Sequence, residues 1–151
     1  MEDVEMNEIT NIARNDDFAM DTQMPKGYES NFKKAKVLKF LNKLGMRCTQ
    51  NGTFFIADIV CYCLNNNIDT IKNLRAFYFD FGSLYYNFNE SKTNNMKCNI
   101  EDSIDYLESS SYRNDELLCS FLSEFKYDQI ITPKQLINGL LTHLLLEYEN
   151  L

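Results

Sequence analysis

Residues 53–66, TFFIADIVCYCLNN, constrain the fold most, because this stretch is apolar on nearly every side. Its Phe, Ile, Val, Tyr and Cys residues favour strands by propensity, but the run exceeds the roughly four to eight residues of a typical strand. Length therefore predicts a helix, and a helix that is apolar all round must lie inside the protein.

Helical periodicity predicts the neighbouring elements. Residues 31–44 place apolar side chains largely on one side and lysines on the other, and Gly45 is expected to end that helix. A third helix is expected from Asp69, a good N-cap, and a short amphipathic helix over residues 116–125. The pattern therefore predicts an all-α domain of about six helices.

The last predicted helix begins with Thr132 as N-cap and Pro133 in its first turn. It is rich in leucine, and is expected either to be central to the core or to form a dimer contact. His143 lies beside this leucine surface and is interpreted as an ordinary surface or capping histidine rather than a functional one.

Residues 78–107 predict a helix-turn-helix. An aromatic helix ends near residue 86, residues 87–95 are a loop by composition, and Met96, Ile100 and Ile104 then keep helical spacing. In such a motif the second helix enters the DNA major groove. The residues that face outward on this helix are acidic and should repel phosphate: Glu101, Asp102 and Asp105.

Composition limits the class of protein. The chain of 151 residues suits one domain and carries a formal net charge of −7. Residues 1–30 hold eight acids and two bases and are expected to form a disordered acidic tail, followed by a folded domain over residues 31–151. Residues 31–80 carry a net charge of +5, and residues 81–151 a net charge of −6.

Several functional classes lack support in the sequence. No apolar run approaches the roughly 20 residues of a membrane span, so we expect no membrane partner and a cytoplasmic location. The five cysteines are interpreted as reduced and mostly buried, and a single histidine leaves no common zinc pattern. Serine, histidine and carboxylates form no recognisable catalytic set, so neither an enzyme nor a cofactor is expected.

From Lys36 onward the order of elements resembles the C-terminal DNA-binding domain of the stage-zero sporulation protein A, a sporulation response regulator. KVLKFLNKLGMRCTQNGTFFIADIVCYCL is similar to its first helix, "LG(I/V)P" turn and "KGYxYLREAI" helix, and FYFDFGSLYY is similar to "LYPDIAKKF". TPKQLINGLLTHLLLE is similar to "PTNSEFIAMVADKLRLE". The residues in matching places are Gly45, Gly52, Ile56, Asp58, Val60, Tyr78, Asp80, Met96, Ile100 and Ile104.

The resemblance covers nearly the whole predicted domain. It implies a helix-turn-helix that binds duplex DNA, often as tandem copies, and regulates transcription. In the second motif helix, "RVERAIRHAI", this chain has Asn95, Cys98 and Glu101 in place of arginines and Asp102 in place of histidine, and only Lys97 adds positive charge. We expect a turn about four residues longer than in the family, and no receiver domain.

Two hypotheses follow. The first is a divergent transcription regulator of the sporulation type that binds DNA through a lysine face and a polar turn. A homodimer is compatible with this hypothesis. Its candidate contacts are Lys33, Lys36, Lys92, Thr93, Asn94, Asn95 and Lys97. The second is a regulatory module that kept the fold, lost DNA binding and contacts a protein partner through Glu101, Asp102 and Asp105.

Overall fold

The computed structural model describes residues 24–122 and 130–149. Within these residues the chain forms six helices and no strand, so the all-α prediction is confirmed. The chain divides into two units, Met1–Lys33 and Lys34–Leu151. Of the predicted disordered tail, residues 1–23 lie outside the described residues.

The first helix, α1 (Met24–Leu44), crosses the division between the units and begins seven residues before the predicted start at Asn31. Pro25 lies in its first turn, where the missing N–H group costs no helical hydrogen bond. The helix ends where predicted, because Gly45 adopts a φ of +110°, which favours glycine. A side chain at Gly45 would also collide with the backbone of Tyr112 and Arg113.

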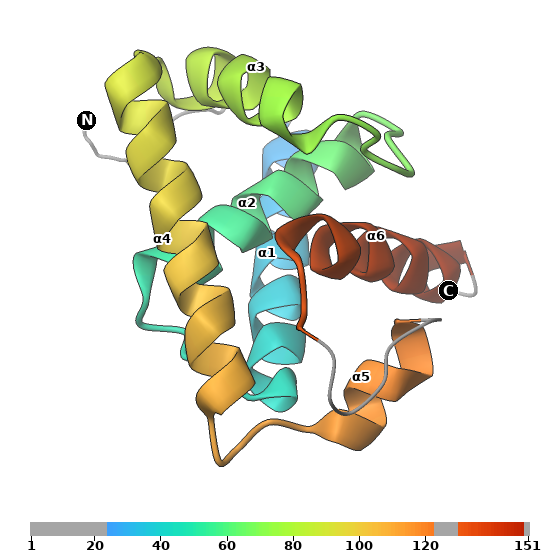
Figure 1. Cartoon of the computed structure of the whole chain (residues 1–151). Coiled ribbons are helices and arrows are strands. Elements are labelled where there is room, and N and C mark those ends of the chain that lie inside the picture. Colours follow the sequence, from blue (N-terminus) through green and yellow to red (C-terminus); the bar gives the residue numbers. More distant parts are fainter. Residues whose placement is uncertain (1–23, 123–129, 150–151) are drawn as a thin grey trace. The chain divides into compact units, whose positions relative to one another are not determined.

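Helix α2 (Asn51–Asn65) is the predicted buried helix and runs through the middle of the second unit (Figure 1). It packs against α4 (Glu90–Ser109) and α6 (Pro133–Glu149). Gly52 makes the contact with α4 close, because a Cβ atom there would overlap the Asn99 carbonyl and the Ser103 hydroxyl. The buried face of α2 forms the centre of the core with Ile56, Ala57, Ile59, Val60, Cys61, Cys63 and Leu64.

Two further helices, α4 and α6, contribute many residues to this core. Helix α4 contributes the predicted apolar positions. Helix α6 buries most of its predicted leucine surface inside the domain, so these leucines belong to the core rather than to a dimer contact. The side chain of Thr132 accepts a hydrogen bond from the Gln135 backbone at 3.1 Å, which confirms the predicted start of α6. The core residues from α4 and α6 are Met96, Ile100, Ile104, Leu107, Leu136, Ile137, Leu140, Leu141 and Leu144.

The third helix, α3 (Leu74–Tyr86), begins later than predicted. The backbone at Ile71 is held outside any helix by the side-chain amide of Asn138 on α6, which accepts from the Ile71 N–H at 2.8 Å and donates to its carbonyl at 3.0 Å. Asn73 then serves as the N-cap in place of Asp69, accepting from the Ala76 backbone. A long-range side-chain contact therefore outweighs the local cap signal.

The short helix α5 (Asp115–Phe121) starts one residue before the predicted position, with Asn114 as its N-cap, and ends before the predicted residue 125. Residues 123–125 of that prediction lie outside the described part of the chain. Between α4 and α5 the Asn114 backbone N–H donates to the Leu44 carbonyl at 2.9 Å. This bond joins the end of α1 to the start of α5.

A buried polar network connects three helices. The Lys34 ammonium on α1 lies 2.8 Å from Oδ1 of Asp58 on α2, and the Tyr86 hydroxyl on α3 donates a hydrogen bond to Oδ2 of Asp58. Burial, followed by the charge of Asp58, raises the pKa of Tyr86 well above its ordinary value. Each oxygen of the buried Asp58 carboxylate thus has its own partner.

The remaining predictions meet mixed results. Cys61 and Cys63 are buried as expected, but Cys98 and Cys119 are exposed, and Cys48 is half-buried. His143 stacks on Phe40 with ring centroids 4.8 Å apart and lies 4.0 Å from Glu147. None of the described helices has an apolar stretch long enough to cross a membrane.

Candidate nucleic-acid interface

Helices α3 and α4 are joined by a turn of three residues, 87–89, and pack against each other. Asn87 ends α3 in a left-handed conformation with φ 59° and ψ 39°, which asparagine tolerates better than most residues. Asn89 begins α4 by accepting a hydrogen bond from the Lys92 backbone at 2.9 Å. This is the connection length of a helix-turn-helix.

The predicted loop over residues 87–95 is therefore wrong beyond Asn89, because α4 begins at Glu90. The extra polar residues form the first turns of α4 instead. Thr93 shows why composition was misleading, because it was predicted to lie in a polar loop, whereas its side chain is only 2% exposed and lies on the buried face of α4. Gly82 on α3 permits the contact, since a Cβ atom there would lie 2.8 Å from the Thr93 hydroxyl.

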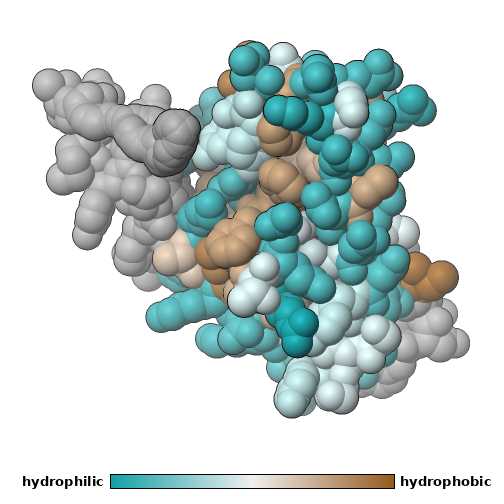
Figure 2. Space-filling view, turned by 90° about the vertical axis from the view of Figure 1, so that its left-hand side faces the viewer, coloured by the Kyte–Doolittle hydropathy of each residue, from teal (hydrophilic) through white to brown (hydrophobic). Residues whose placement is uncertain are grey.

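The exposed face of α4 changes character along the helix. We call residues 90–98 the amide half and residues 99–109 the acidic half. The amide half exposes Ser91, Asn94, Asn95 and Cys98 in succession on one face, and the acidic half continues this face with carboxylates. The side of the domain that carries α4 is mainly hydrophilic (Figure 2).

The predicted DNA-binding residues separate into two groups. Lys92, Asn94, Asn95 and Lys97 all lie in the amide half, with Lys97 half-buried and the other three exposed. Thr93 is too deeply buried to reach a ligand on the outer face.

Of the two lysines predicted on α1, Lys36 does not join this group. Lys36 lies 3.8 Å from Glu147 near the end of α6, which Figure 1 places on the opposite side of the domain from the start of α4. The side chain of Lys33 lies outside the described residues. The structure thus keeps the polar α4 residues of the predicted DNA surface together and gives Lys36 an acidic neighbour elsewhere.

A cavity of about 120 Å³ opens between α3 and the amide half of α4. Two cationic side chains from different helices contribute to it, Arg75 from the first turn of α3 and Lys97 from α4. No carboxylate of the described residues forms an ion pair with either of them. The other lining residues are Tyr78, Phe79, Thr93 and Asn94.

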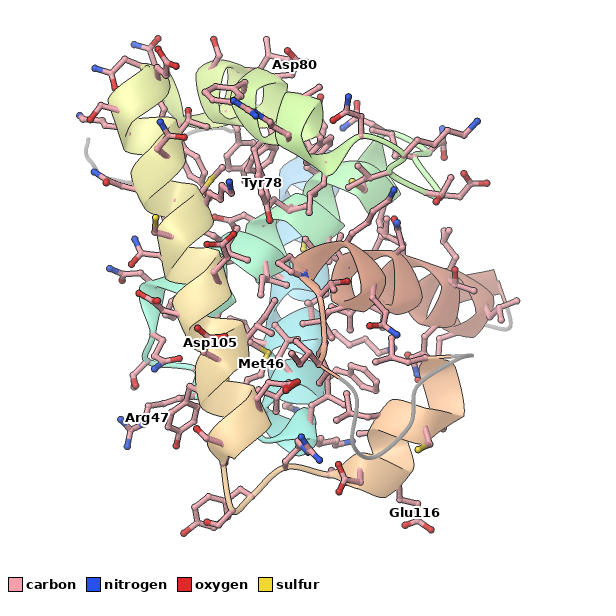
Figure 3. All side chains as sticks on the ribbon, viewed as in Figure 1. Met46, Arg47, Tyr78, Asp80, Asp105 and Glu116 are labelled. Carbon is pink, nitrogen blue, oxygen red and sulfur yellow. The ribbon has the colours of Figure 1, made fainter. Side chains whose placement is uncertain are left out.

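Tyr78 points from α3 into the domain, whereas Asp80 on the same helix points away from it (Figure 3). The Tyr78 side chain is 3% exposed, and its hydroxyl has no hydrogen-bond partner among the described residues. Burial raises the pKa of Tyr78 above its ordinary value, and the charge of the Glu101 carboxylate raises it further by a smaller amount. Tyr78 therefore stays neutral beside the cavity.

The predicted protein-binding residues also lie together. Glu101, Asp102 and Asp105 are exposed on the outer face of the acidic half, and no described cation forms an ion pair with them. Nearby, the Arg47 guanidinium lies 5.3 Å from the centre of the Tyr106 ring. No group of three or more potential metal ligands occurs among the described side chains.

Sequence reasoning passed over Arg75 as a functional candidate. In the sequence, Arg75 is one of eight basic residues between positions 31 and 80 and contributed only to the net charge. In addition, the start of α3 was predicted too early, at Asp69 instead of Leu74. With Asn73 as the N-cap, Arg75 falls in the first turn of α3, next to the first turns of α4. The Asn73 side chain was the local signal that could have indicated this.

The comparisons with known proteins add no relative to this geometry. No protein-family model, no curated protein and no solved structure matches the chain.

Proposed function

We propose that this chain is a divergent helix-turn-helix protein that binds duplex DNA with the amide half of α4 and regulates transcription. The observation that carries the proposal is the connection of α3 to α4 by residues 87–89, which leaves the start of the second helix polar and exposed. In helix-turn-helix proteins the N-terminal residues of the second helix contact base edges.

The chemistry of the amide half fits such contacts. Asn94 and Asn95 offer side-chain amides, and an amide can make two hydrogen bonds to adenine in the major groove, worth about 1 to 3 kcal/mol of discrimination. Ser91 can contact phosphates or bases without charge. Lys92 supplies a positive charge beside these groups.

The position of the carboxylates limits their repulsion. Glu101 follows Glu90, the first residue of α4, by eleven residues, which corresponds to about 16 Å along a helix axis. The Debye length at physiological ionic strength is about 8 Å, so phosphates held at the first turn of α4 are largely screened from Glu101, Asp102 and Asp105. The exposed carboxylate of Glu90 lies in that first turn, where Lys92 offsets its charge. The acidic half must stay outside the groove for binding to occur.

The resemblance to the sporulation-regulator C-terminal domain supports the same proposal and supplies its biological role, a non-enzymatic regulator in the cytoplasm. That resemblance runs through α1 from Lys36, α2, residues 77–86 of α3, the buried face of α4 and α6. A homodimer or tandem pair on DNA would need a surface other than the leucine face of α6, because those leucines are used in the core.

Fluorescence anisotropy across a salt series tests the proposal, with a random duplex pool and a sporulation-type promoter duplex as probes. Lys92→Ala should weaken binding and reduce the slope of log affinity against log salt by about one. Lys43→Ala is the matched control, because Lys43 is an exposed lysine at the other end of the domain, near the end of α1. Absence of binding at low salt would refute the proposal.

A second candidate function follows from the acidic half. Three exposed carboxylates without cationic partners, Glu101, Asp102 and Asp105, form a surface suited to a basic protein. In this alternative the chain has kept the fold and regulates a partner instead of binding DNA.

The two candidates predict different sensitivities. A complex with a basic protein should survive Lys92→Ala and dissociate in the triple variant Glu101→Gln, Asp102→Asn, Asp105→Asn, with affinity measured by calorimetry. The opposite pattern, in which the triple variant binds normally, would exclude the acidic half as the contact surface.

A further inference from the structure

The cavity between α3 and α4 has the chemistry of an anion site. Arg75 and Lys97 reach it from two helices, and neither has an ionic partner among the described residues. Asn94 adds an amide that can donate hydrogen bonds. Two cations and an amide at one small cavity favour an anion and exclude a metal ion.

The identity of the cations narrows the class of anion. The planar guanidinium of arginine matches the geometry of phosphate oxygens in two parallel hydrogen bonds, and lysine adds a compact charge. The cavity measures about 120 Å³ and is therefore suited to one small anionic group rather than to an extended ligand. Tyr78 and Phe79 close it with aromatic surface.

The position of the cavity indicates which molecule would supply the anion. It lies beside the exposed face that Asn94 shares with Asn95, so a nucleic acid against that face would bring its backbone to the cavity. The charge of Glu101, one helical turn beyond Lys97, acts on Tyr78 at this cavity and weakens an anion site there. Glu101 forms no ion pair with Arg75 or Lys97, so both cations stay available to an anion.

We infer that the cavity binds a single phosphate group, held jointly by Arg75 and Lys97. This inference rests on the proposed function, in which the phosphate belongs to the DNA backbone and fixes the register of α4 in the groove. Free phosphate has the same chemistry and is the other source. Because both cations share one phosphate, their contributions to DNA binding are coupled.

The first test needs no DNA. Inorganic phosphate is titrated into the full isotope-labelled chain at constant ionic strength, and backbone amide shifts are followed by NMR. The amides of Thr93, Asn94 and Lys97 should shift and saturate at concentrations on the order of 1 mM. The shifts should disappear in the double variant Arg75→Gln, Lys97→Gln and persist in Lys43→Gln, which removes one positive charge elsewhere.

The second test measures duplex DNA binding by the same variants. Arg75→Gln and Lys97→Gln should each weaken binding several-fold, and the double variant should reduce the salt slope by about one, as for the loss of one phosphate contact, rather than by about two. Glutamine keeps part of the aliphatic stem of the half-buried Lys97, and circular dichroism verifies that each variant is folded.

The outcomes separate the inference from the function on which it rests. Saturable phosphate shifts without DNA binding would establish the cavity as a site for free phosphate and refute the proposed function. DNA binding unaffected by Arg75→Gln and Lys97→Gln, with no phosphate shifts, would overturn the inference and leave the function standing. A slope change of about two would refute the shared phosphate.

Discussion

The amide half and the acidic half of α4 share one continuous buried face, which runs from Met96 through Ile100 to Leu107. Their exposed faces differ, because residues 91–98 expose mainly amides, a hydroxyl and a lysine, whereas residues 101–105 expose carboxylates. Glu90 adds one exposed carboxylate at the first position of α4. The two halves also differ in their neighbours. The cavity with Arg75 adjoins the amide half, and Arg47 lies beside the acidic half through its contact with Tyr106.

This difference shows that the fold and the function place separate demands on the same helix. The buried face needs only apolar or small side chains at helical spacing, and it tolerates Thr93 because Gly82 lies opposite. The exposed face is free to vary, so charge there reports on a ligand rather than on stability. Variants of the two faces can therefore be tested independently.

The largest effect is expected at Gly52, where α2 packs closely against the first residues of the acidic half. Helix propensity alone would favour Gly52→Ala by about 1 kcal/mol. The new Cβ atom would instead overlap the Asn99 carbonyl and the Ser103 hydroxyl, so we expect a net loss of about 2 kcal/mol or more in the free energy of unfolding, measured in urea.

The control for this variant is Asn51→Ala, at an exposed neighbouring position of α2, which should change the free energy of unfolding by less than about 0.5 kcal/mol. A Gly52→Ala protein that is more stable than the natural one would mean that α2 and α4 do not approach each other as closely as described.

The next largest effect is expected when the amide half is given a carboxylate like those of the acidic half. Asn95→Asp places a carboxylate on the exposed face of the amide half, where we expect it to repel phosphate and to lower DNA affinity about tenfold or more at physiological salt. Anisotropy measures the loss. Asn42→Asp adds the same charge on the exposed surface of α1 and should leave affinity nearly unchanged, and equal losses in both variants would contradict a localised interface.

The sequence was sufficient to predict most of the core. The buried positions of α2, α4 and α6 follow from apolar periodicity, and Thr132 with Pro133 marked the start of α6 correctly. The start of α3 was mispredicted because the Asn138 amide binds the Ile71 backbone from 67 residues away, a contact that no local pattern contains.

The candidate site was less accessible to sequence reasoning. Residues 90–95 have the composition of a loop, and their helical structure depends on the Asn89 cap and on burial of Thr93 against α3. Arg75 becomes a neighbour of Lys97 only when α3 and α4 pack together. Both features require the tertiary fold, although the identities of the exposed amides and carboxylates were evident beforehand.

A smaller effect is expected at Tyr78 on α3, which lines the cavity beside the amide half and is affected by the charge of Glu101 in the acidic half. Its buried hydroxyl has no partner among the described residues, so Tyr78→Phe should raise the free energy of unfolding by about 1 kcal/mol at pH 7. The folded protein also raises the pKa of Tyr78, through burial first and Glu101 second. The unfolded chain therefore loses this proton first as the pH rises above about 10.

It follows that ionisation of Tyr78 does not affect the free energy of unfolding below about pH 10 and lowers it progressively above that pH. Urea titrations at neutral and alkaline pH should show a smaller alkaline loss in Tyr78→Phe than in the natural protein. Glu101→Gln should reduce that loss only in part, since burial is the larger cause. A destabilised Tyr78→Phe protein would indicate that the hydroxyl does have a partner.

The smallest effect is expected at Asp102, which lies on the same exposed face as Asn95 and two turns further along. If only the amide half enters the groove, Asp102→Asn should change DNA affinity by less than about threefold at physiological ionic strength, where the Debye length is about 8 Å. At 0.01 M salt that length is about 30 Å, so the same variant should then bind more tightly than the natural protein. A gain of tenfold at physiological salt would place the acidic half against the phosphates, and the interface would then extend along the whole of α4 rather than stop at residue 98.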